Sequence, residues 1–283
     1  MYIFKKIFDL QNHLAYQRNQ GKTIGFAPTM GALHQGHVSL IAAAKAKGDY
    51  AVCSIFVNPT QFNDPNDFAK YPRTTATDCD LLIQNGCDVL FLPDVDEMYP
   101  PNETVTKPQY DLGGLDLPME GAQRPGHFAG MLQVVEKLLN IVMPDHLYMG
   151  QKDFQQLAIV RRYLQLTQRP IELFGCPTLR EPHGLAMSSR NERLTSDQRQ
   201  RAAKIYQALS HVRKHYRQAN IEQLCQISIA VLEEEPDFKV EYLEVCNAIT
   251  LQSLQNWDDA AEIVACIALK VGDIRLIDNV LIP

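Results

Sequence analysis

Residues 26–40 read FAPTMGALHQGHVSL, and this stretch decides the fold of the 283-residue chain. The apolar residues that end at Pro28 are typical of a buried strand, and the pattern from His37 onward is typical of a helix. Gly31 and Gly36 lie between them and allow close approach of the backbone to a ligand. A helix start presents backbone N–H groups and the positive end of the helix dipole, so the stretch predicts an anion site.

Further apolar runs extend this unit into a sheet. Buried strands are predicted over residues 23–28, 50–57, 87–93, 146–150 and 171–176. Helical patterns lie between them at residues 37–47, 77–84, 128–142 and 154–166. Alternation of strand and helix predicts a parallel sheet with right-handed crossovers. Ligands of such sheets bind beyond the carboxyl ends of the strands, so the site is expected in the loops after Ala27, Val57, Leu92, Met149 and Cys176.

The pattern changes after Asn191. Thr195 and Gln198 form a capping-box pattern that predicts a long helix through about residue 217, and a second helix is predicted from near residue 220 to before Pro236. Strand-like runs follow at residues 239–246, 262–269 and 275–282, and their short connections predict an antiparallel sheet. The predicted fold class is α/β, with a Rossmann-like parallel sheet in residues 1–178 and a smaller α+β domain in residues 179–283.

The composition is typical of a soluble globular protein of the cytoplasm. Hydrophobic residues make up 46% of the chain, which is enough to offset chain entropy on folding. The net charge of −6 argues against a partner such as long nucleic acid, which is held through its phosphates. No signal peptide and no membrane-spanning run are recognisable. The seven cysteines include no Cys-x-x-Cys pair, so neither a disulfide framework nor a zinc ribbon is expected.

His34 and His37 are the first candidate catalytic residues. They lie three positions apart, near one side of a helical turn, where imidazoles can donate hydrogen bonds to a phosphate whose charge grows during displacement. Two alternatives remain at this point. A metal-binding pair would lack obvious further ligands, and two ordinary surface histidines need no function.

A wider set of segments carries a family resemblance. His-x-Gly-His behind a first strand resembles the signature of class I aminoacyl-tRNA synthetases and related nucleotidyltransferases. The full set resembles the pantothenate synthetase family, ligases that join pantoate to β-alanine. Its segments are PTMGALHQGHVSL (28–40), FVNPTQF (56–62), YPRT (71–74), EGAQRPGHFAGM (120–131), GQKDFQQ (150–156) and GLAMSSRN (184–191). The resemblance covers most of residues 24–194, and the C-terminal third matches only in its general pattern.

The resemblance implies an ATP-dependent condensation of (R)-pantoate with β-alanine. The pantoate carboxylate attacks the α-phosphorus of ATP to give pantoyl adenylate and pyrophosphate, and the amine of β-alanine then displaces AMP. Such a displacement depends on positioning and charge stabilisation. The resemblance also implies Mg²⁺, bound through phosphates with few protein ligands, and a homodimer without nucleic-acid or membrane partners.

The resemblance further implies which residues bind ATP. His34, His37 and Lys152 are the implied catalytic residues, and Lys152 is expected at the bridging and departing phosphate oxygens. The implied ATP-binding residues are Met30, Gly31, Ala32, Leu33, His34, Gln35, Gly36, His37, Gly150, Gln151, Lys152, Asp153, Leu179, Met187, Ser188, Ser189 and Arg190. A solvated lysine is the alternative for Lys152, a simple polar turn for residues 188–191, and core packing for Leu179 and Met187.

For the acid substrate, Gln61 and Gln156 resemble the paired amides that hold the pantoate hydroxyl and carboxylate. Asn58 is placed beside them, and a cap on the backbone is the alternative for either glutamine. Two other pairs are weaker candidates. Arg124 and His127 could help near β-alanine or be exposed loop residues, and Asp78 and Asp80 could contribute to Mg²⁺ binding or complement a helix dipole.

Two rival functions remain. An adenylyltransferase would need a phosphate-bearing acceptor, and the paired Gln61 and Gln156, rather than an extra basic cluster, argue against it. A non-catalytic nucleotide-sensing module would have little reason to keep Lys152 together with the two histidines. Because the segment with Ser188 lies at the predicted domain junction, we expect residues 179–283 to form a lid that closes over ATP, with a hinge at residues 182–185.

Overall fold

The computed structural model describes residues 1–61, 68–69, 71–101 and 109–283, and the chain forms two compact units. The first unit contains Met1–Asp111, Gln123–Gln151 and Val160–Pro177. The second contains Leu112–Ala122, Lys152–Ile159 and Thr178–Pro283. The sequence pattern placed the two internal segments of the second unit in the first domain. Phe62, the last residue of the FVNPTQF segment, lies outside the described residues.

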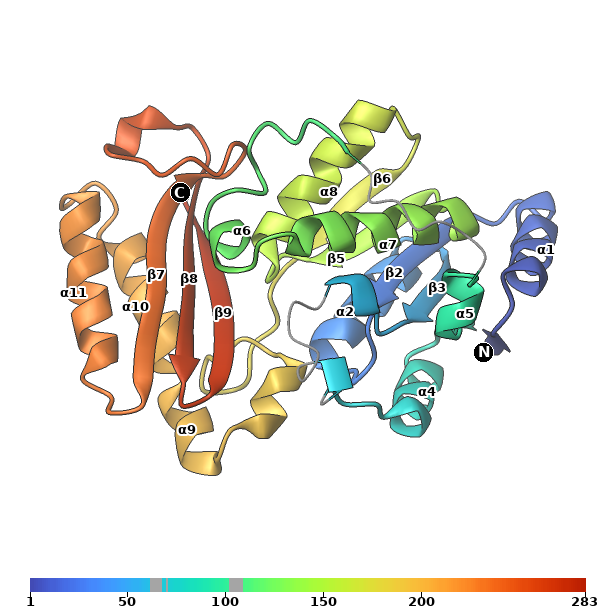
Figure 1. Cartoon of the computed structure of the whole chain (residues 1–283), viewed down its shortest axis with the longest axis horizontal. Coiled ribbons are helices and arrows are strands. Elements are labelled where there is room, and N and C mark those ends of the chain that lie inside the picture. Colours follow the sequence, from blue (N-terminus) through green and yellow to red (C-terminus); the bar gives the residue numbers. More distant parts are fainter. Residues whose placement is uncertain (62–67, 70, 102–108) are drawn as a thin grey trace. The chain divides into compact units, whose positions relative to one another are not determined.

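The first unit is built on a six-stranded sheet with the order β1-β4-β3-β2-β5-β6 (Figure 1). The strands are β1 (Tyr2–Phe4), β2 (Ile24–Thr29), β3 (Tyr50–Ile55), β4 (Val89–Phe91), β5 (His146–Gly150) and β6 (Glu172–Cys176). All their pairings are parallel, which confirms the predicted α/β class. Strand order changes direction at β2, between β3 and β5, so the carboxyl end of β2 is the switch point where ligands bind in such sheets.

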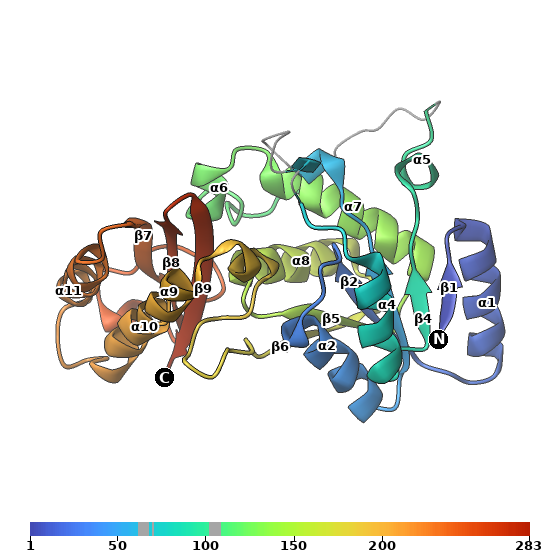
Figure 2. The same ribbon diagram turned by 90° about the horizontal axis from the view of Figure 1, so that it is seen from below.

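Helices cover both faces of this sheet (Figure 2). They are α1 (Ile7–Asn19), α2 (Gln35–Ala46), α4 (Thr75–Gln84), α5 (Val95–Met98) and α7 (His127–Val142), while α8 (Phe154–Thr167) begins in the second unit and ends in the first. Leu40 and Ile41 of α2 and Leu82 of α4 share one core cluster with Ala27 and Cys53 of the sheet. None of the helices described here is a candidate for a membrane span.

Sequence periodicity predicted one of the next two elements and missed the other. The first is the helix at residues 128–142, and the second is the short strand β1. α7 buries the residues whose spacing predicted it, among them Val135, Leu139 and Val142. β1 was not predicted, because it has only three residues and Tyr2 and Ile3 remain 60% and 49% exposed. Its position at the edge of the sheet leaves no buried pattern to detect.

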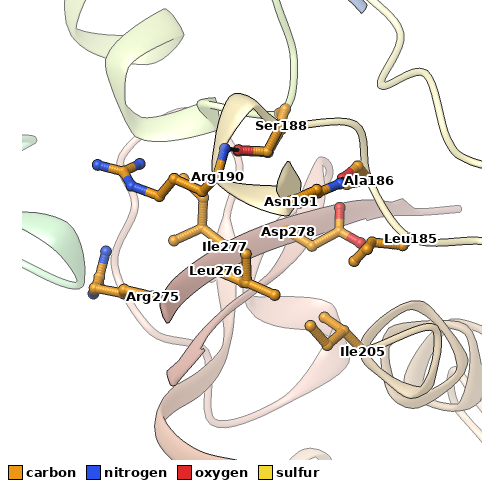
Figure 3. Close-up of a pocket in the computed structure, with 11 residues that line it drawn as sticks. Leu185, Ala186, Ser188, Arg190, Asn191, Ile205, Arg275, Leu276, Ile277 and Asp278 are labelled. Carbon is orange, nitrogen blue, oxygen red and sulfur yellow. Dashed lines mark hydrogen bonds between the residues drawn. The ribbon is translucent and has the colours of Figure 1, made fainter. Parts of the chain in front are cut away.

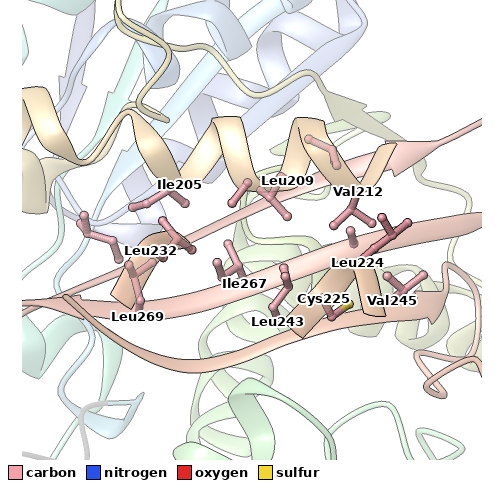
Figure 4. Close-up of a cluster of buried hydrophobic side chains, with 14 of the residues drawn as sticks. Ile205, Leu209, Val212, Leu224, Cys225, Leu232, Leu243, Val245, Ile267 and Leu269 are labelled. Carbon is pink, nitrogen blue, oxygen red and sulfur yellow. The ribbon is translucent and has the colours of Figure 1, made fainter. Parts of the chain in front are cut away.

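The second unit contains an antiparallel sheet of β7 (Phe238–Asn247), β8 (Ile263–Val271) and β9 (Ile274–Ile282), as predicted. Its helices are α6 (Glu120–Gln123, whose last residue falls in the first unit), α9 (Ser196–Arg201), α10 (Lys204–Lys214) and α11 (Ile221–Glu233). Leu209 of α10 and Leu224 of α11 lie in one apolar cluster with Leu243 and Ile267 of the sheet (Figure 4). This cluster is the core of the second unit.

The single long helix predicted from residue 195 to 217 is wrong. The capping box is present, since Gln198 N donates to Thr195 Oγ1 at 3.2 Å and Thr195 N to Gln198 Oε1 at 3.1 Å. The helix it opens ends at Arg201, where Ala203 N bonds to Gln200 O at 3.3 Å. This i to i−3 bond tightens the backbone and separates α9 from α10.

We expect Cys79 to be the only fast-reacting thiol of the native protein. All seven cysteines are free, and every one except Cys79 is buried. Burial raises the pKa of Cys87 to about 12 and that of Cys225 to about 11, so little reactive thiolate forms near pH 8. Titration with a disulfide reagent should label Cys79 first, and all seven after denaturation. Fast labelling of Cys53 or Cys266 in the native protein would contradict the buried placement.

Candidate active site

The loop between β2 and α2 holds His34 and His37 in a defined orientation. His34 Nδ1 accepts a hydrogen bond from Gly36 N at 3.1 Å, and His37 Nδ1 accepts one from His34 N at 3.3 Å. A ring nitrogen that accepts from a backbone N–H carries no proton, so each neutral ring has its proton on Nε2. The ring centroids are 4.1 Å apart. Nε2–H is therefore the group through which each ring can donate to a ligand.

A buried carboxylate fixes the same loop. Asp78, only 1% exposed, accepts hydrogen bonds from Ala32 N at 3.0 Å and Leu33 N at 2.8 Å. The Thr74 hydroxyl donates to it at 3.0 Å. The loop needs this support because Ala32 has a φ of 50°, in the left-handed region that costs energy for a residue with a side chain.

Gly31 in this loop has no room for a side chain. Its φ is +83°, and a Cβ there would lie 3.0 Å from Ile55 Cγ2 and 3.2 Å from Asp78 Oδ2. The glycine thus allows the loop to approach the carboxylate closely.

A metal centre is not formed by these groups. In the part of the chain that the structure describes, no three His, Cys, Asp or Glu side chains are grouped to hold a metal ion. The Asp78 carboxylate is directed at the loop, and Asp80 is exposed.

Gln61 lies beside the histidine loop in the first unit. It ends the short 3₁₀ turn Pro59–Gln61 that follows β3, and its Nε2 is 3.1 Å from Met30 Sδ. Asn58, 1% exposed, donates to Gly130 O at 3.2 Å and accepts from the Tyr99 hydroxyl at 2.9 Å. Asn58 Nδ2 is also 3.3 Å from Gln61 Oε1. The Asn58 amide is thus used to support the turn, and its contact with pantoate stays a prediction.

His127 holds the same turn from the start of α7. Its Nδ1 is 3.0 Å from Gln61 O, and its Nε2 is 3.2 Å from Arg124 Nη1. A carbonyl can only accept, so Nδ1 carries the proton, Nε2 accepts from Arg124, and the ring is neutral. Gly130 lies one turn further along α7, where a Cβ would overlap the backbone of Thr60 and Gln61. His127 is only 7% exposed, so it is not an exposed loop residue.

A pocket of the second unit gathers the other predicted phosphate-binding residues (Figure 3). Lys152, Ser188 and Arg190 line it, together with Arg275 and Asp278. Burial works against the charge of Arg275, but ion pairs with carboxylates outweigh it and raise the pKa of its guanidinium. The nearer carboxylate is Glu120, whose oxygens lie 2.6 and 2.7 Å away. Because Arg275 is neutralised in this way, we expect Lys152 to supply positive charge that attracts an anion.

The residues before and after Ser189 form a capped 3₁₀ turn, Ser189–Arg193. Arg190 N donates to Ser188 Oγ at 3.3 Å (Figure 3), and Asn191, 1% exposed, donates to Ala186 O at 3.0 Å. The segment is therefore a polar turn, as the simpler interpretation held. It also lines the pocket with Lys152, which that interpretation did not require.

The other predicted ATP-binding residues are distributed over both units. Gly150 ends β5, and Gln151 N donates to Cys176 O at 2.8 Å. In the second unit, Asp153 is exposed directly before α8, and Gln156 is partly exposed in its first turn. Leu179 is 41% exposed, so core packing does not explain it. Gln35, Met187 and Ser189 complete the set, with Gln35 exposed and the other two partly exposed.

The predicted hinge at residues 182–185 is a hydrogen-bonded turn within the second unit. Glu181 N donates to Leu185 O and Gly184 N to Glu181 O, both at 2.8 Å. Arg180 and Ala186 form an antiparallel bridge around the turn. These bonds hold the turn as one piece and make it a poor bending point.

Comparison with known proteins identifies the family. A family model described as Pantoate-beta-alanine ligase matches residues 2–281. The chain belongs to the pantoate-beta-alanine ligase family. It is 46% identical to the pantothenate synthetase of Azobacteroides pseudotrichonymphae over 281 residues, which cover 99% of each chain. Identity to the pantothenate synthetase of Bacteroides thetaiotaomicron is 44% over 280 residues, 99% of this chain and 98% of that one.

Solved structures of this ligase family have the same fold. The pantothenate synthetase from Thermus thermophilus matches with a TM-score of 0.92 at 37% identity, over 100% of both chains. The pantoate-beta-alanine ligase from Francisella tularensis matches with a TM-score of 0.80 at 38% identity, over 99% of this chain and 97% of that one. That structure was determined in complex with beta-gamma ATP and beta-alanine.

Several supporting residues of this pantoate-beta-alanine ligase were not recognised from the sequence. Asp78 was considered only as a helix-dipole acid or metal ligand, and His127 only as a neighbour of β-alanine or an exposed loop residue. Both act through contacts far apart in the chain, such as Asp78 with Leu33 and His127 with Gln61. A single sequence contains no spacing that would reveal such pairs.

Removing the Asp78 carboxylate should disturb the histidine loop. In Asp78→Ala the N–H groups of Ala32 and Leu33 lose their acceptor, so we expect the free energy of unfolding to fall by about 2 kcal/mol or more. Pantoate-dependent ATP–pyrophosphate exchange should fall at least about tenfold, because misplaced donors are costly. Urea denaturation and the exchange assay measure both effects. Gln84→Ala, an exposed change in the same helix, is the control, and an Asp78→Ala protein equal to it in both assays would contradict this role.

Proposed function

We propose that this protein is an ATP-dependent ligase that condenses (R)-pantoate with β-alanine through pantoyl adenylate, releasing pyrophosphate and AMP. The observation that carries the proposal is the pair of Nε2–H donors of His34 and His37, held at the switch point of the parallel sheet in a chain that matches its family over residues 2–281. The related Francisella ligase in complex with beta-gamma ATP and beta-alanine supports the same two substrates here.

In the first step, a carboxylate oxygen of pantoate forms a bond to the α-phosphorus of ATP. The bond from that phosphorus to the bridging oxygen breaks, and its electron pair leaves with pyrophosphate. His34 and His37 donate from Nε2 to the phosphate oxygens as their charge grows. Lys152, supported by the Ser188–Arg190 turn, stabilises the departing pyrophosphate, because these residues share one cationic pocket.

In the second step, the neutral amine of β-alanine attacks the acyl carbon of pantoyl adenylate. A C–N bond forms, the C–O bond to AMP breaks with its electron pair on the phosphate oxygen, and the amine nitrogen loses a proton. Positioning provides most of this acceleration, since the mixed anhydride is already activated. We place β-alanine next to Gln61 after pyrophosphate has left.

Gln61 and Gln156 hold the hydroxyl and carboxylate of pantoate in this proposal. Amides orient an anion through hydrogen bonds without pairing with it as strongly as arginine does, so the carboxylate stays nucleophilic. The support that Gln61 receives from Asn58 and His127 fits this orienting role. The remaining ATP-binding residues keep the roles that the resemblance implies.

The family resemblance also supports Mg²⁺ as the counter-ion of the ATP phosphates. When bound, this ion would neutralise phosphate charge. The same resemblance supports a homodimer, a cytoplasmic location and the role of residues 179–283 as a lid. These parts of the proposal stay predictions.

The adenylate route predicts transfer of an oxygen atom. Pantoate labelled with oxygen-18 in its carboxylate should deliver one labelled oxygen to AMP when β-alanine and ATP are present, because the oxygen that attacks phosphorus stays with AMP. Mass spectrometry of AMP and pantothenate measures the distribution. Label that stays wholly in pantothenate would exclude pantoyl adenylate.

The assigned roles predict different kinetic effects for two variants. Lys152→Ala should lower the adenylation rate by roughly 10²-fold or more, the range for a preorganised group that stabilises developing charge. Gln156→Ala should chiefly raise the KM for pantoate, because an orienting amide already acts in the ground state. Single-turnover and steady-state assays separate the two effects. Lys270→Ala, an exposed lysine in β8, is the control, and wild-type single-turnover adenylation by Lys152→Ala would show that its assignment is wrong.

A further inference from the structure

Strand β9 contacts both phosphate-binding segments of the second unit through consecutive side chains. It is the last strand in the order β7-β8-β9, so its outer edge is open to other segments. Side chains along a strand point alternately to opposite faces. Leu276, Val280 and Ile282 belong to the core cluster, and the alternate positions, including Arg275 and Asn279, therefore lie on the other face.

On that other face, Asn279 contacts the backbone of Lys152. Its Nδ2 donates to Lys152 O at 2.8 Å, and Asn279 is only 4% exposed. The bond joins residues 127 positions apart, so no local turn explains it. It fixes the carbonyl of Lys152, which is one of the residues that line the pocket.

Arg275, on the same face of β9, fixes a second neighbour. Its Nη2 and Nη1 donate to Glu120 at 2.6 and 2.7 Å, and the Tyr242 hydroxyl donates to Glu120 at 2.8 Å. Gln155, in the first turn of α8, donates to Leu115 O at 2.8 Å. The segments at residues 112–122 and 152–159 are therefore joined to each other and to β9, which explains why both belong to the second unit.

On the core face, Asp278 fixes the segment that leads to Ser188. Its carboxylate forms a two-pronged ion pair with Arg180, at 2.5 and 3.0 Å. Arg180 also donates to Gly184 O at 3.2 Å and lies 3.7 Å from the centre of the Tyr206 ring. Burial raises the pKa of Asp278 even beside this cation, so keeping the carboxylate charged costs free energy. The ion pair therefore serves mainly to fix the position of Arg180.

We propose that Asn279 is a positioning residue that acts through Lys152, and that β9 sets the place of Lys152 relative to Ser188 and Arg190. This inference rests on the proposed function, because Lys152 must contact the phosphates for its position to matter. Asn279 itself touches no reacting atom. Its effect is to hold the Lys152 backbone, so that the ammonium group reaches the same point in every turnover.

The test is a double-mutant cycle with Asn279→Leu and Lys152→Ala. Asn279→Leu removes the donor at similar volume, and we expect the kcat of pantoate-dependent ATP–pyrophosphate exchange to fall about tenfold with the KM for ATP changed less than about twofold. In the Lys152→Ala background the same substitution should change the rate less than about twofold, because the ammonium group that Asn279 is proposed to position is absent. Equal losses in both backgrounds, or a wild-type rate in Asn279→Leu, would overturn the proposal.

A measurement independent of activity separates this inference from the proposed function. Hydrogen–deuterium exchange at residues 152–157 should be faster in Asn279→Leu than in Leu281→Ala, a control on the same face of β9 that is 49% exposed in the native protein. Unchanged exchange would show that Asn279 does not hold Lys152. Absence of pyrophosphate exchange in the wild-type protein would instead refute the proposed function. If Asn279→Leu fails to fold, Asn279→Ala in the same two assays decides the question.

Discussion

The hydrogen bonds of the backbone N–H groups between Ala32 and Gly36 are the constraint on which the first unit's site depends. A loop at the end of a buried strand must satisfy these groups, and here it does so with three side chains. Asp78 accepts from Ala32 and Leu33, while His34 and His37 accept from Gly36 and His34. Each histidine thus accepts a backbone hydrogen bond at Nδ1 and carries its proton on Nε2, from which it can donate a hydrogen bond to a ligand. The chemistry follows from how the loop satisfies its own backbone.

In the second unit, partly buried ion pairs perform the corresponding task. Arg275 is paired with Glu120, and Arg180 with Asp278. Such pairs contribute little net stability, because desolvation offsets much of the attraction, but they place the groups they join within narrow limits. They also neutralise the charge of Arg180 and Arg275, which would otherwise attract an anion. Lys152 is then a cation of this pocket that we expect to meet a phosphate.

The parts of the fold and the site that could be predicted are those that a local sequence pattern encodes. α7 and β5 were predicted almost residue by residue, because α7 buries a helical stripe and β5 is a continuous apolar run. The histidine loop and Lys152 could be predicted as site residues because their motifs are contiguous in the sequence. By contrast, the assignment of residues 112–122 to the second unit depends on Glu120 meeting Arg275, 155 positions away. No period or spacing encodes such a pair, so the sequence could not reveal it.

The tautomer enforced by the loop determines the charge that the two histidines bring to the first unit's site. If Nδ1 of His34 or His37 were protonated, it would lose the bond from the backbone N–H that it now accepts. The loop geometry therefore favours neutral rings, which act on a phosphate as dipoles. In the proposed reaction, full positive charge is therefore expected from another residue, and Lys152 is the one that the family resemblance implies. Because a dipole acts only at short range while a charge acts further, the proposed reaction assigns the histidines to the phosphorus under attack and Lys152 to the departing pyrophosphate.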